Sequence, residues 1–94
     1  MTPEQNPDSL ALTLLIPVRN EGVNIKIMLK VLNGVIEVPH EVLFVYDHPE
    51  DNSIEIVNNL KDQFPNTRLI HNQSGMGVVN ALRAGVNAAK GEYI

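Results

Sequence analysis

The sequence contains no cysteine, which excludes disulfides, thiol nucleophiles and cysteine-based metal sites. Basic residues are also few: seven Lys and Arg against eleven Asp and Glu give a net charge of −4, which argues against a nucleic-acid partner. No apolar run approaches the roughly 20 residues that a membrane span needs. The polar, acidic N-terminus lacks the basic-then-apolar plan of a signal peptide. We therefore expect a cytoplasmic chain and leave open the membrane association of a longer parent protein.

What the sequence does have is an alternation of apolar runs with segments of helical period. The hydrophobic fraction of 44% and the charged fraction of 19% are those of a globular domain. The runs Leu14–Ile16 and Val42–Val45 are apolar on both faces, which is typical of parallel strands covered by helices on both sides. Strands are expected at 10–16, 41–46, 67–72 and 92–94, with helices between them and the third helix from Gly75 to Ala89.

This βαβαβαβ order predicts an α/β fold of three layers, Rossmann-like, with right-handed crossovers and a parallel sheet in the strand order 3-2-1-4. The fourth strand has only three residues, so we expect residues 10–94 to be the first part of a longer domain. Residues 1–9 have two prolines and no periodicity, and are expected to form a disordered lead-in.

The helix ends and faces can also be predicted. Asn20 is expected to cap the first helix, and Gly91 to end the third. Asp51 and Asn52 both offer caps for the second helix, and with Asn52 as the cap Glu55 completes a capping box. The expected buried stripes are Ile25, Met28, Leu29, Leu32 and Ile36 in the first helix, Ile54, Val57, Leu60 and Phe64 in the second, and Val78, Leu82, Val86 and Ala89 in the third.

Polar residues follow the first two strands at their carboxyl ends, the edge at which open α/β sheets bind ligands. The segment Pro17-Val18-Arg19-Asn20-Glu21 can hold a nucleobase and ribose, although a plain helix start explains the same residues. Asp47 can accept a hydrogen bond from a base N–H or a ribose hydroxyl, and a polar turn is the alternative explanation.

Gly75 and Gly77 follow the third strand and open a helix, the setting in which backbone N–H groups bind phosphate. The third glycine of the dinucleotide fingerprint is missing, so tight packing of the turn is the alternative. The three histidines show no metal-ligand spacing, and no Ser-His-Asp set, P-loop lysine or pair of catalytic carboxylates can be assembled. No catalytic residue and no metal ligand are assigned.

Four motifs in order resemble the family 2 glycosyltransferases of the GT-A fold, including the dolichyl-phosphate mannosyltransferase-like members. They are Pro17-Val18-Arg19-Asn20-Glu21, the strand Val42 to Asp47 with Asp51, Gly75-Met76-Gly77, and Ala88-Ala89-Lys90-Gly91-Glu92-Tyr93-Ile94. The family typically reads P-x-x-N-E, V-D-D-x-S-x-D, G-x-G and A-x-G-x-Y-I, and the likeness runs from about Leu12 to Ile94.

This resemblance implies that residues 17–20 line a cleft for the base and ribose, and that Asp47 hydrogen-bonds the base. It implies a UDP- or GDP-sugar donor, an acceptor such as a lipid phosphate or polysaccharide, and Mg²⁺ or Mn²⁺ bound by an Asp-x-Asp motif just past Ile94. The sequence departs from the family at Tyr46 and at His48-Pro49, which replace the first Asp and a Gly-Ser pair, and at Ser74, where relatives often carry Arg or Lys.

By this interpretation the chain is the nucleotide-binding part of a glycosyltransferase and is inactive alone. Two alternatives remain from the residues: a non-catalytic Rossmann-like nucleotide-binding module, or an interaction module. Because the short fourth strand leaves part of the first strand uncovered, we also expect a homodimer formed through an exposed sheet edge.

Overall fold

The computed structural model describes residues 10–73, 75 and 77–94, so the expected lead-in and Ser74 lie outside the described residues. The chain alternates strands and helices, as the sequence predicts. The elements are β1 (Leu12–Pro17), α1 (Gly22–Val35), β2 (His40–Tyr46), α2 (Asn52–Leu60), β3 (Thr67–His71) and α3 (Val78–Ala88).

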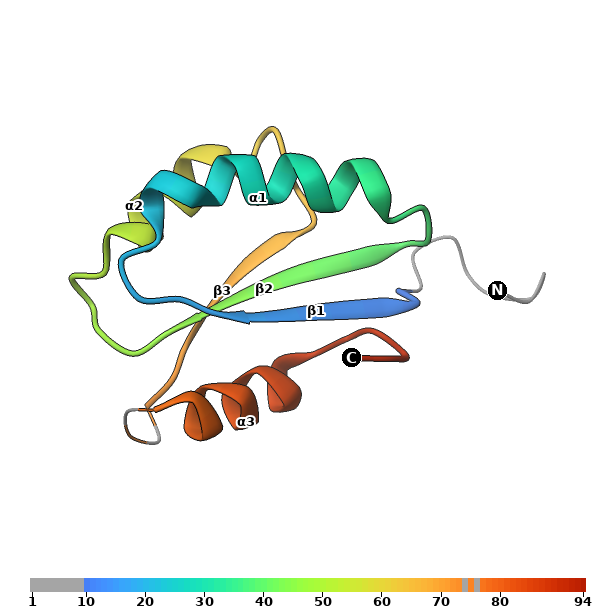
Figure 1. The fold of residues 1–94 in the computed structure, drawn as a ribbon. Helices are drawn as coiled ribbons and strands as arrows, with labels where there is room; N and C mark the ends of the chain where they lie inside the picture. The colour runs from blue at the N-terminus through green and yellow to red at the C-terminus, as the bar shows by residue number, and fades with distance from the viewer. Residues whose placement is uncertain (1–9, 74, 76) are drawn as a thin grey trace.

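The three strands form a parallel sheet in the order β1-β2-β3, with Leu12 opposite His40 and Val42 opposite Thr67. Helices α1 and α2 cover one face of this sheet and α3 covers the other, so the three-layer α/β fold is confirmed (Figure 1). Tyr93 makes a parallel bridge to Leu12 on the outer edge of β1. This bridge stands where the fourth strand of the order 3-2-1-4 is expected, although one bridge is less than the predicted strand.

The main core lies between the sheet and the α1–α2 layer. Val42 and Phe44 of β2 are completely buried there against Ile25 and Leu29 of α1 and Val57 of α2. The predicted stripes of the first two helices are therefore confirmed in Ile25, Leu29 and Val57. Phe64 is also buried in this core, although it lies beyond the end of α2, and the remaining members are half-buried. Among the described residues, no helix combines the length and the apolarity that crossing a bilayer requires.

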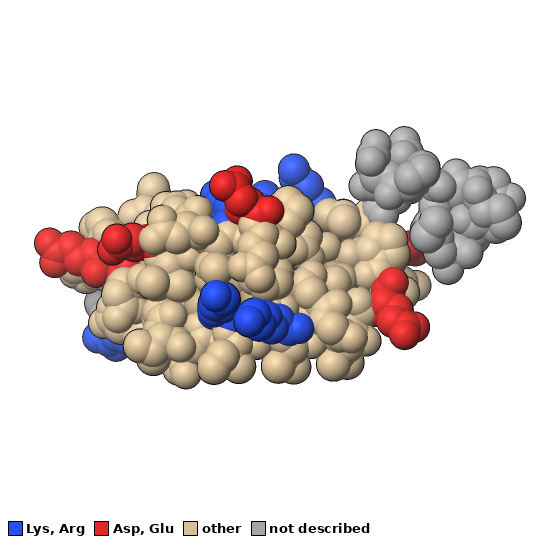
Figure 2. All heavy atoms as spheres, turned by 90° about the horizontal axis from the view of Figure 1, so that it is seen from above, with Lys and Arg blue, Asp and Glu red and all other residues tan. Residues whose placement is uncertain are grey.

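The outer face of α1 carries apolar residues four positions apart: Val23, Ile27, Val31 and Val35 are all exposed. Figure 2, which views the α1–α2 face, shows charged side chains scattered over this surface with wide uncharged areas between them. The packing of the described residues does not explain this stripe.

The prediction for α3 is wrong about its inward face. Val78, Leu82 and Val86 are 63%, 39% and 52% exposed, and the buried positions are instead Ala81 and Gly85. A Cβ at Gly85 would collide with the side chain of Leu15. The helix approaches β1 so closely that only small residues fit against the sheet, and hydrophobic period alone does not reveal this.

The helix ends also differ from the expectations. The cap of α1 is Glu21 and not Asn20, whereas α2 is capped by Asp51, one of the two caps that the sequence offers, and not by Asn52. Helix α3 ends at Ala88 with Ala89 as its C-cap, and Gly91 is not the cap. At Gly91 the chain passes over β1 so closely that a Cβ there would lie 2.5 Å from backbone atoms of that strand.

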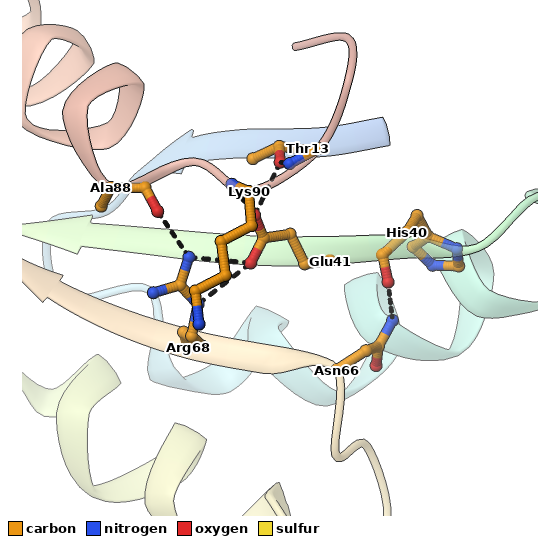
Figure 3. A network of polar contacts seen from close by, with 8 residues as sticks. Thr13, His40, Glu41, Asn66, Arg68, Ala88 and Lys90 are labelled. Carbon is orange, nitrogen blue, oxygen red and sulfur yellow. Dashed lines mark hydrogen bonds and ion pairs between the residues drawn. The ribbon is translucent and has the colours of Figure 1, made fainter. Parts of the chain in front are cut away.

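At the amino-terminal edge of the sheet a buried carboxylate joins four segments (Figure 3). Glu41 of β2 is 3% exposed, and its Oε2 accepts hydrogen bonds from Thr13 Oγ1 at 2.7 Å and from the Lys90 N–H at 2.6 Å. Its Oε1 accepts from Arg68 Nε at 3.0 Å, and Arg68 also donates to the Ala88 carbonyl at 2.7 Å. These contacts fasten the segment after α3 to all three strands.

Burial raises the pKa of Glu41, but the hydrogen bonds from Lys90, Thr13 and Arg68 and the positive charge of Arg68 outweigh it, so the pKa lies below the ordinary 4.5. The carboxylate is therefore ionised at neutral pH. Its role is structural, because it lies at the sheet edge opposite the residues predicted to bind a ligand.

Candidate functional site

The segment after β1 leaves the sheet through a sharp change of backbone direction. Val18 is buried and its N–H donates to the Val45 carbonyl at 2.9 Å, which extends the strand pairing by one residue. Arg19 and Asn20 then become exposed, and Asn20 has φ of +52°. Asparagine is among the few residues that tolerate this left-handed region, so the turn explains why Asn stands at position 20.

Asp51 holds this turn in place from the start of α2. Its Oδ1 accepts the Ser53 N–H at 2.8 Å, capping its own helix, and its Oδ2 accepts the Asn20 N–H at 3.0 Å. Burial raises the pKa of Asp51, but the hydrogen bonds from Ser53 and Asn20, with the charge of His48, outweigh it and bring the pKa below 3.8. The sequence prediction that Asp51 is a cap is confirmed, and its carboxylate is occupied within the fold.

The helix starts of α1 and α2 are linked further by a reciprocal set of contacts. The Asn52 N–H donates to Asn20 Oδ1 at 3.1 Å, and Asn52 Oδ1 accepts the Gly22 N–H at 2.9 Å. Ser53 Oγ accepts the Glu21 N–H at 2.9 Å. The first N–H groups of α1 are thus satisfied by side chains of α2, and Asn20 faces this linkage instead of capping its own helix.

Asp47, at the end of β2, is held by a residue that the sequence analysis missed. Asn72 follows β3, is 3% exposed, and donates from Nδ2 to Asp47 Oδ1 at 2.6 Å. The same nitrogen donates to the Gly75 carbonyl at 2.7 Å. The sequence places Asn72 at the carboxyl end of the third strand, at the same sheet edge as Asp47, but no local pattern marks its contact with Asp47.

Two aromatic rings lie beside this pair. Tyr46 and His71 are opposite each other on β2 and β3, and their rings stack with centroids 4.8 Å apart and 3° between planes. His71 Nε2 is 3.2 Å from the Asp47 carbonyl oxygen, so this nitrogen is the donor. Tyr46 also packs against the core, which accounts for an aromatic residue at this strand end.

Two adjacent cavities open at this edge of the sheet. One, of about 350 Å³, is lined by Val18, Arg19, Asn20, Asp47, His48, Glu50 and Asp51. The other, of about 240 Å³, is lined by Pro17, Val18, Arg19, Glu21, Val45, Asp47, Gly77, Val78 and Ala81. The first is within the size range of small-molecule pockets.

The structure thus brings seven of the eight predicted site residues to these two cavities, which share Val18, Arg19 and Asp47. The eighth, Gly75, lines neither cavity and touches the site through its carbonyl bond to Asn72. Gly75 and Gly77 have φ of +109° and +110°, which favours glycine at both positions. Within residues 10–73, 75 and 77–94, no group of three His, Asp or Glu side chains is arranged to hold a metal ion.

A strand-end cleft of this kind is common to many α/β proteins, and comparison with known sequences decides between families. The family model "Glycosyl transferase family 2" matches residues 13–94. The chain belongs to this family. The resemblance drawn from the four sequence motifs is confirmed.

Individual relatives of this glycosyltransferase family 2 chain are distant. The uncharacterized glycosyltransferase YibD of Escherichia coli is 29% identical over 83 residues, covering 88% of this chain and 24% of the relative. The dolichol-phosphate mannosyltransferase of Saccharomyces cerevisiae is 30% identical over 90 residues, covering 92% and 34%. A dolichyl-phosphate beta-glucosyltransferase of Trichomonas vaginalis is 30% identical over 97 residues, covering 95% and 29%. The chain spans about a quarter to a third of the length of these relatives.

Proposed function

We propose that this chain is the nucleotide-binding part of a glycosyltransferase that moves a sugar from a nucleotide-diphospho-sugar to an acceptor. The observation that carries the proposal is the cavity at the carboxyl ends of β1 and β2, where Val18, Arg19, Asn20 and Asp47 meet. Family membership supports sugar transfer in general, and the cavity supports a role for these residues in donor binding.

Asp47 is the residue proposed to bind the base. Its Oδ1 accepts the Asn72 amide, and among the described residues Oδ2 has no hydrogen-bond partner. A carboxylate oxygen only accepts, so a contact to the ring nitrogen of the base selects a base in which that nitrogen carries a hydrogen. Uracil N3–H and guanine N1–H meet this need, whereas the ring nitrogen of cytosine at the same edge is an acceptor. We therefore propose a UDP- or GDP-sugar as the donor.

Val18 and the exposed Arg19 and Asn20 form the other wall of the cavity and are proposed to contact the base and ribose, with Pro17 and Glu21 beside them. Gly77, at the start of α3, is proposed to face the phosphates with Gly75 nearby, because a helix N-terminus with a glycine turn favours an anion.

No catalytic residue of the transfer is proposed within the described residues, and they do not fit a metal site. The Mg²⁺ or Mn²⁺ expected for the parent protein would be bound by other residues of that protein. A lipid phosphate is proposed as the acceptor class, since relatives are named for dolichyl phosphate, with a polysaccharide as the alternative. Dimerisation through the edge of β1 stays a prediction.

Isothermal titration of the chain with UDP, GDP and CDP tests the proposal. We expect UDP or GDP to bind more tightly than CDP, and Asp47→Ala to weaken the preferred nucleotide by about 1–3 kcal/mol, the usual effect of removing a partner from a buried polar group. Asp62→Ala removes the same charge from an exposed turn and serves as the matched control. Equal affinities for Asp47→Ala and the unmodified chain would remove Asp47 from the site.

If the chain is instead a non-catalytic nucleotide-binding module, the same nucleotide affinities are expected in this titration. The two differ in the parent protein, where a transferase releases nucleoside diphosphate from the donor in the presence of an acceptor. An Asp-x-Asp motif downstream in the parent gene favours the transferase, and release of nucleoside diphosphate that does not depend on the acceptor would count against it.

A further inference from the structure

Asn72 occupies a fixed position between two parts of the candidate site. Its side-chain nitrogen lies 2.6 Å from Asp47 Oδ1 and 2.7 Å from the Gly75 carbonyl oxygen. Both neighbours are acceptors, so the atom between them must be the amide donor, and the orientation of the amide is determined. The Asn72 backbone N–H also donates to the Tyr46 carbonyl at 2.8 Å, which holds the residue against the end of β2.

The hydrogen bond from Asn72 Nδ2 to Asp47 Oδ1 restricts the orientation of the Asp47 carboxylate. A carboxylate at a strand end can rotate about its terminal bond, and a short hydrogen bond to one oxygen fixes that rotation. With Oδ1 engaged by a side chain that is 3% exposed, Oδ2 is the oxygen left to meet a ligand. The second bond, to Gly75, ties the same amide to the segment that leads into α3.

We propose that Asn72 is a positioning residue for nucleotide binding: it orients the Asp47 carboxylate toward the base and holds the glycine turn beside it. This inference rests on the proposed function. It adds a residue outside the four family motifs, and it predicts a base-dependent effect. A purely structural Asn72 would affect folding, or would weaken all nucleotides equally.

Asn72→Asp is the sharpest test because it keeps the shape of the side chain and removes the donor. At about pH 8 two ionised carboxylates would face each other, whereas at about pH 5.5 a proton shared between them restores a donor and an acceptor. Titration with UDP and GDP should therefore show a loss of about tenfold or more at the higher pH, relative to the unmodified chain, and recovery at the lower pH.

The unmodified chain, titrated at both pH values, corrects for the other ionisable groups near Asp47. These are Arg19, His48, Glu50 and Asp51 around the larger cavity, Glu21 in the smaller cavity, and His71 at the Asp47 carbonyl. Asn66→Asp is the matched control: Asn66 Nδ2 also has two acceptors, Asn33 Oδ1 at 3.0 Å and the His40 carbonyl at 3.2 Å, but at the opposite sheet edge. We expect Asn66→Asp to leave nucleotide affinity nearly unchanged at both pH values.

The outcomes separate this inference from the proposed function. If the unmodified chain binds neither UDP nor GDP, the proposed function fails and the role of Asn72 falls with it. If the unmodified chain binds but Asn72→Asp has the same relative affinity at both pH values, only the role of Asn72 is overturned. If circular dichroism shows that Asn72→Asp does not fold, Asn72→Ala carries the test. It should then reduce the preference for UDP or GDP over CDP by about tenfold, and an equal loss for all three nucleotides overturns the inference.

Discussion

Replacing Glu41 with glutamine should destabilise the fold more than any other single charge removal that leaves side-chain size unchanged. The carboxylate receives donors from Thr13 and Lys90 on one oxygen and two nitrogens of Arg68 on the other. A glutamine amide keeps one acceptor oxygen and must turn its NH₂ group toward one of these two donor pairs. Glu41→Gln therefore loses two hydrogen bonds to a charged acceptor whichever way the amide is oriented.

The free-energy cost of Glu41→Gln depends on which of the two donor pairs loses its acceptor. Arg68 is 32% exposed, so it can recover a hydrogen bond from water, while Thr13 is completely buried and cannot. The amide oxygen should therefore face Thr13 and Lys90, and the cost is the unpaired Arg68 at about 2–3 kcal/mol, which is below the roughly 3–5 kcal/mol for a fully buried ion pair because Arg68 is partly exposed. For a domain of this size this corresponds to a fall in melting temperature of roughly 8–24 °C.

Urea denaturation followed by circular dichroism measures the effect, with Glu37→Gln as the control because Glu37 is exposed. The pH dependence gives a second test. The folded-state pKa of Glu41 is lowered, so its contribution is complete above the ordinary value of 4.5 and is lost as pH falls through the lower folded value. The difference between the unmodified chain and Glu41→Gln should shrink in that acidic range. A Glu41→Gln variant within about 0.5 kcal/mol of the unmodified chain near neutral pH would refute the reasoning.

Three other substitutions have definite expected outcomes. Gly91→Ala places a Cβ 2.5 Å from the β1 backbone and should cost more than about 2 kcal/mol in urea denaturation, whereas Gly34→Ala, with open space around it, should stabilise α1 by about 0.5–1 kcal/mol. If both variants have equal stability, the inference that the backbone at Gly91 lies too close to β1 for a Cβ is wrong. Asp51→Ala removes the α2 cap and the acceptor of the Asn20 N–H, so it should cost about 1–2 kcal/mol, and a loss no larger than that of the exposed Asp62→Ala would contradict the linked helix starts.

Much of the fold could be predicted because its main signals are local. Apolar runs without alternation, such as Val42–Val45, indicate strands buried on both faces, and the period of α1 and α2 identifies Ile25, Leu29 and Val57 as core. The prediction failed at α3 because this helix packs against the sheet through the small residues Ala81 and Gly85. A stripe of small residues has little hydrophobic contrast, so the larger valines beside it suggested the opposite face.

The candidate site was predictable to a similar extent. Strand ends placed Asp47 and the segment from Pro17 to Glu21 at one edge, since parallel strands share their carboxyl edge. The contacts of Asn20 could not be predicted, because they depend on residues 31 and 32 positions away. Asn72 was missed for a related reason: its importance comes from the atoms it meets across the sheet, and no local pattern encodes them.

The Glu41 network has a consequence for the order in which the chain folds. All strand pairs are parallel, so the first contacts across the sheet join residues far apart: Thr13 meets Glu41 at a separation of 28, and Glu41 meets the Lys90 N–H at a separation of 49. During synthesis β1 and β2 can pair before Lys90 has left the ribosome, but Oε2 of the buried carboxylate then has Thr13 as a donor and lacks the Lys90 N–H. An intermediate without residues 88–91 should therefore admit water at Glu41 and exchange its β2 amides readily. Docking of this last segment is then the step that makes the sheet resistant to proteolysis.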